Sequence, residues 1–173
     1  MNSTIVGKIE EALRPLIGLQ LFKAWNIFAT RLLYFATPGE HPTSEDGDYR
    51  ITLECPWRIE QEGCIIVGSE DYGLRASTNL DPAWDPTEMQ WGHRQDEKLV
   101  DLLGESRNGV IFNTGIKLVV ESLEGDAFGG FRLYLSGGYT LGAFPTTDGA
   151  MEWLLSPRQG ASISWTNGNL SLS

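Results

Sequence analysis

The sequence is poor in the residues that usually carry enzymatic chemistry. It has only two histidines and two cysteines in 173 residues. It contains no Gly-x-Gly-x-x-Gly, no phosphate-binding Gly-Lys-Ser/Thr loop, no His-Glu-x-x-His and no Gly-x-Ser-x-Gly. No reaction class is indicated, so we expect a protein that is not an enzyme and that has no catalytic residue and no cofactor.

A metal site is disfavoured as well. His41 and His93 fall in predicted loops far apart in the sequence, and a zinc site would need further ligands beside them. The acids of Glu45–Asp48, and those around Asp81 and Asp85, lack the ligand spacing of a calcium-binding EF-hand loop. We interpret them as solvated loop acids and expect no metal.

Long hydrophobic runs are also missing. The most apolar stretch, residues 16–36, is interrupted by Lys23, Asn26 and Arg31, which makes it a poor membrane span. Residues 1–6 lack the charged start and continuous apolar core of a secretory signal. We therefore expect a cytoplasmic protein that does not engage a membrane.

The charge balance is strongly acidic. The chain has 13 basic and 23 acidic residues, for a formal net charge of -10. Such a charge repels the phosphate backbone of nucleic acids and attracts a basic partner, although it also serves solubility alone. Nucleic-acid binding is thus disfavoured; solubility is the leading interpretation of the charge, and a basic protein partner is the alternative.

Composition and length predict a single domain over residues 1–173. Hydrophobic residues make up 41% and charged residues 21%, which is typical of a globular chain. A chain of this size buries about 70% of its unfolded surface in one core. Turn-forming residues mark two loops, at 37–47 and at about 70–97, and the second is long, irregular and acidic.

The stretch from Asp48 to Ser69 has the clearest secondary-structure pattern in the sequence. Alternate apolar positions over residues 51–59 predict one strand with a buried face, and a polar break at residues 60–63 precedes a second strand at residues 64–67. In this hairpin Cys64 would face Ile59 and Cys55 would face the region of Gly68, too far apart for a disulfide. We expect two reduced, buried or half-buried thiols.

The remaining pattern predicts an α+β fold with mostly antiparallel pairing and about eight to ten strands. Helices are expected at residues 3–14 and 95–104, and strands at 19–24, 31–36 and 115–122; one helix over 19–34 is the alternative to the first two strands. Two hairpins turn at Gly137-Gly138 and Asn167-Gly168, and residues 151–155 form a strand or a helical turn.

The long acidic loop is the predicted binding site. Trp84, Trp91 and Tyr72 lie in or beside it with Asp81 and Asp85, and tryptophan and tyrosine are favoured interface anchors. The alternative is that the two tryptophans fold back as a lid on the core.

Arg58 is a further candidate binding residue. It follows the inward-facing Trp57, so its guanidinium would lie on the other strand face and pair with a carboxylate across the sheet or stack on an aromatic ring. Like Trp57, Cys55 falls on the alternate strand positions that face the core, which favours packing over a role as nucleophile.

Several segments together are similar to a group of small uncharacterised bacterial proteins. They include Leu53-Glu-Cys-Pro-Trp-Arg-Ile59, Ile66-Val-Gly-Ser-Glu-Asp71 and Leu133-Tyr-Leu-Ser-Gly-Gly-Tyr139. Some proteins of this kind look like immunity partners of polymorphic toxins, so the resemblance implies binding rather than catalysis. It carries over no catalytic residue.

Two hypotheses follow. The first is a non-enzymatic immunity protein that binds a basic toxin domain through its acidic surface. The alternative is a small-molecule or carbohydrate-binding domain with an aromatic-lined pocket.

Overall fold

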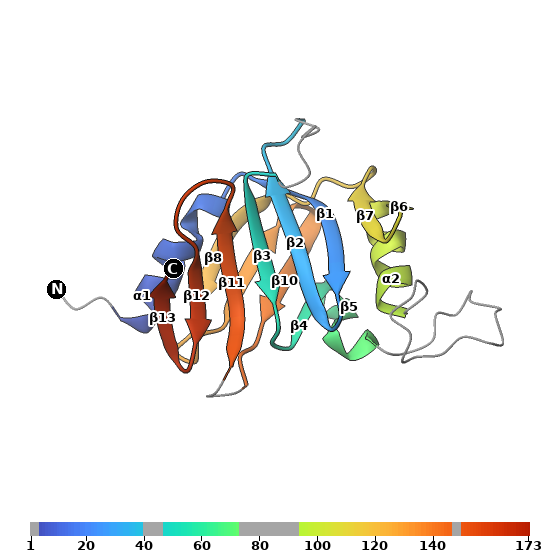
Figure 1. Cartoon of the computed structure of the whole chain (residues 1–173). Coiled ribbons are helices and arrows are strands. Elements are labelled where there is room, and N and C mark those ends of the chain that lie inside the picture. Colours follow the sequence, from blue (N-terminus) through green and yellow to red (C-terminus); the bar gives the residue numbers. More distant parts are fainter. Residues whose placement is uncertain (1–3, 40–46, 73–93, 147–149) are drawn as a thin grey trace.

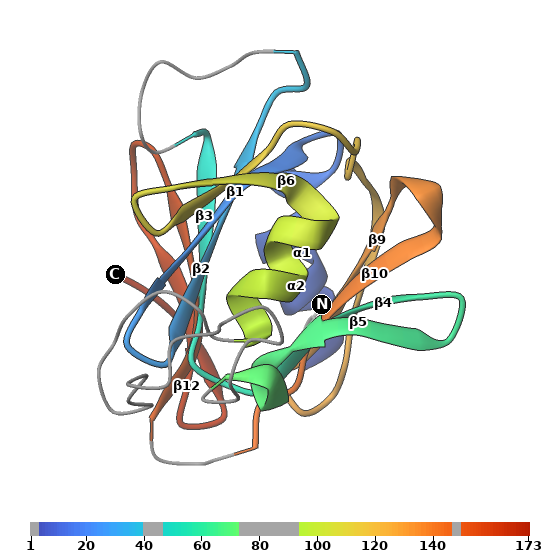
Figure 2. The same cartoon turned by 90° about the vertical axis from the view of Figure 1, so that its right-hand side faces the viewer.

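Two antiparallel sheets pack face to face, and a helix closes each end of the space between them (Figures 1 and 2). This computed structural model describes residues 4–39, 47–72, 94–146 and 150–173. The described residues form two α-helices and thirteen strands, which confirms the predicted α+β class with its N-terminal and mid-chain helices. The strands outnumber the predicted eight to ten.

The larger sheet has eight strands in the order β13-β12-β11-β3-β2-β1-β7-β6. Their bounds are β1 Gln20–Ile27, β2 Thr30–Ala36, β3 Tyr49–Leu53, β6 Gly104–Arg107, β7 Val110–Asn113, β11 Met151–Pro157, β12 Ile163–Thr166 and β13 Asn169–Leu172. The smaller sheet has the order β5-β4-β10-β9-β8, with β4 Trp57–Gln61, β5 Cys64–Gly68, β8 Val120–Gly125, β9 Phe131–Leu135 and β10 Tyr139–Ala143.

The helices fill the ends of the sandwich with their apolar faces. α1 (Ile5–Leu13) starts at Thr4, whose hydroxyl accepts a hydrogen bond from the Gly7 amide at 3.2 Å, and it packs on β8. α2 (Arg94–Leu103) packs on β5, β6 and β7 through Leu99 and Leu103. Short 3₁₀ turns cover Arg14–Leu16, Ser69–Asp71 and Ser136–Gly138.

One apolar cluster joins both sheets and both helices. Trp57, Trp153 and Trp165 are buried in it, whereas Trp25 is 37% exposed at its edge. Three of the four described tryptophans therefore belong to the core.

The predicted strand over residues 51–59 is wrong, because the chain changes sheets within it. β3 belongs to the larger sheet and β4 to the smaller one. Between them the Glu54 and Cys55 amides both donate to the Glu152 carbonyl, at 2.9 and 3.0 Å, and Pro56 has no amide hydrogen to continue a ladder. The apolar alternation continues across the break because both strands face the same core.

The β4–β5 hairpin forms with a different register from the predicted one. Glu62 and Gly63 both have positive φ angles, which places the turn there and sets Cys64 opposite Gln61 rather than Ile59. Cys64 is consequently exposed, which corrects the expectation that both thiols are buried or half-buried. Both cysteines are free, as expected.

The other element predictions are largely confirmed. Residues 19–36 form two strands rather than one helix, although their turn lies at Phe28-Ala29 and not at Asn26. The hairpins at Gly137-Gly138 and Asn167-Gly168 form, and residues 151–157 are a strand. The strand expected at 115–122 starts only at Val120 and runs to Gly125.

Candidate functional site

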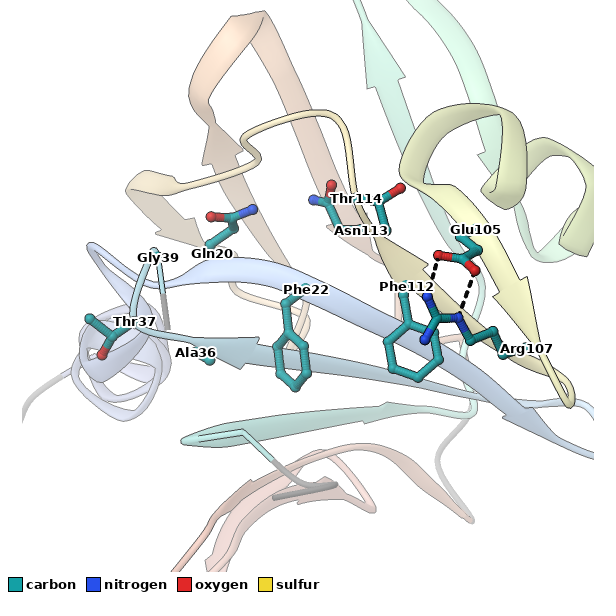
Figure 3. A pocket seen from close by; sticks show the side chains of 10 residues that line it. All are labelled: Gln20, Phe22, Ala36, Thr37, Gly39, Glu105, Arg107, Phe112, Asn113 and Thr114. Carbon is teal, nitrogen blue, oxygen red and sulfur yellow. Dashed lines mark hydrogen bonds and ion pairs between the residues drawn. The ribbon is translucent and has the colours of Figure 1, made fainter. Parts of the chain in front are cut away.

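An open groove lies beside β1 and β7 (Figure 3). Its volume is about 400 Å³. We call it the Phe22 groove; it is lined by Gln20, Phe22, Ala36, Thr37, Gly39, Glu105, Arg107, Phe112, Asn113 and Thr114.

A β-bulge aims Phe22 into this groove. The β1–β2 register shifts between Leu21 and Lys23, so Phe22 has no partner in the ladder. Its ring lies close to Gly47, where a Cβ atom would come within 2.5 Å of the Phe22 Cε1 atom. Gly47 also has φ of 57°, so the backbone conformation and the space beside the ring both require glycine.

Polar side chains also line the groove, and Gln20, Asn113 and Thr114 lie on the opposite side of the strands from the two phenyl rings (Figure 3). The Asn113 side-chain amide donates to the Leu21 carbonyl at 2.7 Å, while its Oδ1 atom is buried with no hydrogen-bond partner among the residues that the structure describes. Such a buried acceptor is costly to leave unpaired.

An arginine–glutamate pair forms the rim. Arg107 donates to Glu105 through Nε at 2.6 Å and Nη2 at 2.8 Å. These hydrogen bonds lower the pKa of Glu105 and raise the pKa of Arg107. The guanidinium lies 5.9 Å from the Phe112 ring centroid, so it presents a fixed cation beside an aromatic face.

Arg58 lies on the outer face of the smaller sheet, away from the groove. Its side chain is 38% exposed, donates to Glu60 at 2.9 Å and lies 4.7 Å from the Phe144 ring centroid. Arg132 approaches the same ring to 5.7 Å. Arg58 thus makes both expected kinds of contact, although its carboxylate partner is on its own strand and not across the sheet.

Of the other predicted site residues, the structure describes Tyr72 alone. Tyr72 is half-buried and ends the 3₁₀ turn at Ser69–Asp71. Trp84, Trp91, Asp81 and Asp85 lie outside the described residues, so the predicted aromatic surface stays a prediction.

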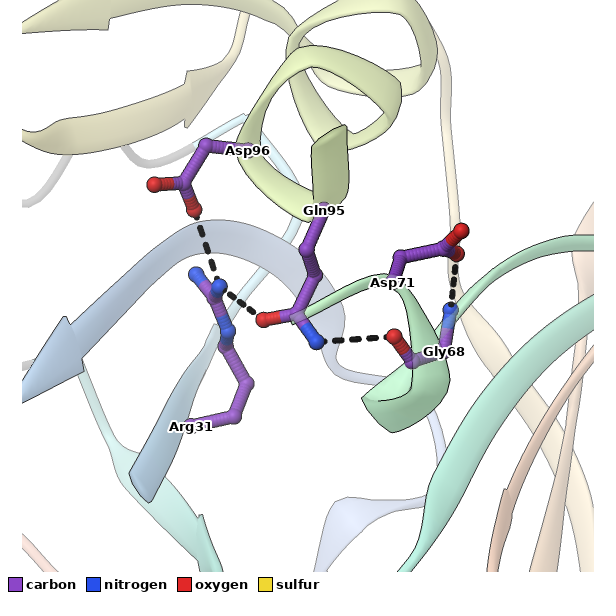
Figure 4. Close-up of polar contacts among 5 residues, drawn as sticks. All are labelled: Arg31, Gly68, Asp71, Gln95 and Asp96. Atoms are coloured by element: carbon purple, nitrogen blue, oxygen red, sulfur yellow. Dashed lines mark hydrogen bonds and ion pairs between the residues drawn. The ribbon is translucent and has the colours of Figure 1, made fainter. Parts of the chain in front are cut away.

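A buried polar network that the sequence reasoning missed lies between the sheets (Figure 4). Arg31 of β2 is 1% exposed and donates from Nη2 to Asp96 at 2.8 Å and to Gln95. Gln95 donates in turn to the Gly68 carbonyl at 2.7 Å. The signal in the sequence was a single arginine within the apolar run of a predicted strand.

The network continues to Asp71. Its carboxylate accepts hydrogen bonds from the Gly68 amide at 3.0 Å and from Lys98 at 2.7 Å. Burial lowers the pKa of Arg31, and Asp96 acts against that shift by stabilising the charged guanidinium. The Arg31 Nε and Nη1 atoms have no hydrogen-bond partner in the described part of the chain. Because the network connects β2, α2 and β5, we interpret it as structural.

The described residues show no metal centre, and the buried thiol of Cys55 is not activated. They contain no group of three histidine, cysteine, aspartate or glutamate side chains placed to hold a metal ion. Burial raises the pKa of Cys55 to about 12, so its thiol is not ionised near neutral pH. Within the same residues, every helix is too short or too polar to cross a bilayer.

Comparison with protein-family models, with curated proteins and with solved structures found no match to this chain. The side chains that line its hollows are therefore the basis for assigning a function.

We predict that one of the two thiols reacts in the folded protein. A thiol reagent reacts with the thiolate, so exposed Cys64 should be modified within minutes at about pH 8, whereas Cys55 should react only after unfolding. Titration of thiols with and without denaturant measures this. In Cys64→Ser, rapid modification of the folded protein would contradict the buried position of Cys55.

Proposed function

We propose that this protein is a non-enzymatic binding protein that holds a small polyhydroxylated ligand, such as a carbohydrate, in the Phe22 groove. The observation that carries the proposal is that two phenyl rings and several polar side chains line one hollow. This is the arrangement of a site that packs an apolar ring face and fixes its orientation through a few polar groups.

The dimensions and chemistry of the groove support a small ligand. A volume of about 400 Å³ lies within the range of small-molecule sites, roughly 300–1,000 Å³. Phe22 and Phe112 supply apolar surface for the C–H face of a sugar ring. Gln20, Thr37 and Thr114 in the lining can exchange hydrogen bonds with hydroxyl groups, and the Arg107–Glu105 pair offers both a donor and an acceptor at the rim.

The test is a screen of mono- and oligosaccharides, followed by calorimetric titration of any that bind. We expect Phe112→Ala to weaken binding by about tenfold or more, because one ring face is lost. Phe144→Ala is the matched control, since that ring lies on the outer face of the other sheet between Arg58 and Arg132. Equal affinity in wild type and Phe112→Ala, or equal losses in both variants, would refute the groove as the site.

A second candidate is the immunity protein suggested by the acidic charge, with a basic toxin domain as its partner. One observation favours a protein partner: the β1–β2 tip exposes Trp25 by 37%, Ile27 by 43% and Phe28 by 65%. Phe28 also has φ of 57°, a costly conformation for a bulky residue. Exposed aromatic side chains of this kind are favoured anchors in protein interfaces.

This candidate is tested with the purified product of the neighbouring gene, provided that it encodes a toxin-like basic domain. We expect a complex that Phe28→Ala weakens at least tenfold, with Ile65→Ala as the control because Ile65 is a similarly exposed apolar residue on β5. A toxin that is neither bound nor inhibited, or a complex that both substitutions leave unchanged, would reject the immunity role.

A further inference from the structure

The larger sheet carries a second hollow on the same face as the Phe22 groove. Directly opposed residues in an antiparallel sheet point to one face. The register places Phe112, Lys23, Tyr34, Arg50 and Ser156 in a single row across β7, β1, β2, β3 and β11. Phe112 lines the groove at one end of this row. At the other end is a hollow of about 180 Å³, the Arg50 hollow, lined by Tyr34, Arg50, Ser156, Pro157 and Arg158.

Two arginines in this hollow lack a carboxylate partner among the described residues. Arg31, Arg58, Arg94 and Arg107 each lie within 4.0 Å of an acidic side chain. Arg50 and Arg158 form no such pair in the described part of the chain. Within the described residues, these two guanidinium groups around one hollow contrast with the net charge of -10 of the chain.

Arg50 also has an unmet hydrogen-bond donor. Its Nε atom is buried and has no hydrogen-bond partner within the described ranges. The hydroxyl of Thr52, two residues further along the same face of β3, is buried and unpartnered there too. A buried donor without a partner costs free energy, and Arg50, which carries one, lines the hollow.

The neighbouring side chains are held in ways that suit an anion. The Ser156 hydroxyl accepts a hydrogen bond from Ser162 at 3.2 Å, which leaves its own hydrogen available to donate. On the other side of Tyr34, the Lys23 Nζ atom lies 3.9 Å from the ring centroid. Arg158 is exposed at the mouth of the hollow, where it can close over a ligand.

From these contacts we propose that the Arg50 hollow binds an oxyanion, the phosphate or carboxylate group of a small molecule. Arginine forks match both groups through paired N–H donors, and such charge-assisted bonds are the strong ones. The Ser156 hydroxyl adds a third donor. This site is separate from the Phe22 groove and does not depend on sugar binding there.

The experiment is calorimetric titration of the full chain with inorganic phosphate and, in a second arm, with acetate, in chloride buffer of constant ionic strength. Saturable binding of either anion is expected, and the tighter one identifies the group. Arg158→Gln should weaken it about tenfold or more, because a charge-assisted bond is lost at an exposed position that leaves the fold intact.

Three further variants make the test specific. Arg50→Lys keeps the charge but loses the fork, so it should bind more weakly than wild type and more tightly than Arg50→Gln. Arg107→Gln is the matched control, since its guanidinium is already paired with Glu105. Thermal unfolding of each variant checks that it is folded. The absence of saturable binding of both anions, or equal affinity in wild type, Arg158→Gln and Arg50→Gln, would overturn the proposal.

Discussion

The buried guanidinium of Arg31 is the constraint on which the arrangement of this sandwich depends. A charge that is 1% exposed is costly unless it is paired and hydrogen-bonded, and Asp96 and Gln95 at the start of α2 supply these contacts. Gln95 also bonds to the Gly68 carbonyl of β5. The network therefore links β2 of the larger sheet, α2 and β5 of the smaller sheet, and it fixes how α2 closes one end of the core.

Both proposed ligand sites lie on the outside of the closed sandwich. The two inner faces and both helices share one apolar cluster, and the hollows in the described residues lie at the surface. The two outer sheet faces differ in character. The larger sheet presents the Phe22 groove and the Arg50 hollow, with aromatic rings and unpaired polar atoms, whereas Arg58 and Arg132 on the smaller sheet are stacked on Phe144.

Local sequence patterns predicted most of the helices and strands. They did not predict contacts between residues that are far apart in the sequence. The hairpins at Gly137-Gly138 and Asn167-Gly168 follow from turn chemistry, which acts between neighbours in the chain. The change of sheet between β3 and β4 leaves the apolar alternation intact, so the pattern does not reveal it.

The candidate site was harder to predict than the fold. Phe22 enters the groove through a bulge, which one strand's sequence does not specify without its partner strand. The partners of Arg31 lie more than 60 residues away in the chain. Similarly, Arg50 stands out only once the register places it between Tyr34 and Ser156. The aromatic loop residues that the sequence favoured remain a hypothesis.

The most direct test of the role of Arg31 is a double-mutant cycle with Arg31→Met and Asp96→Asn, measured by chemical denaturation. If the buried pair holds α2 against the sheets, the coupling energy should be at least about 1 kcal/mol, because each single change leaves the other partner unpaired. A coupling energy near zero, with two small and additive losses of stability, would contradict this account.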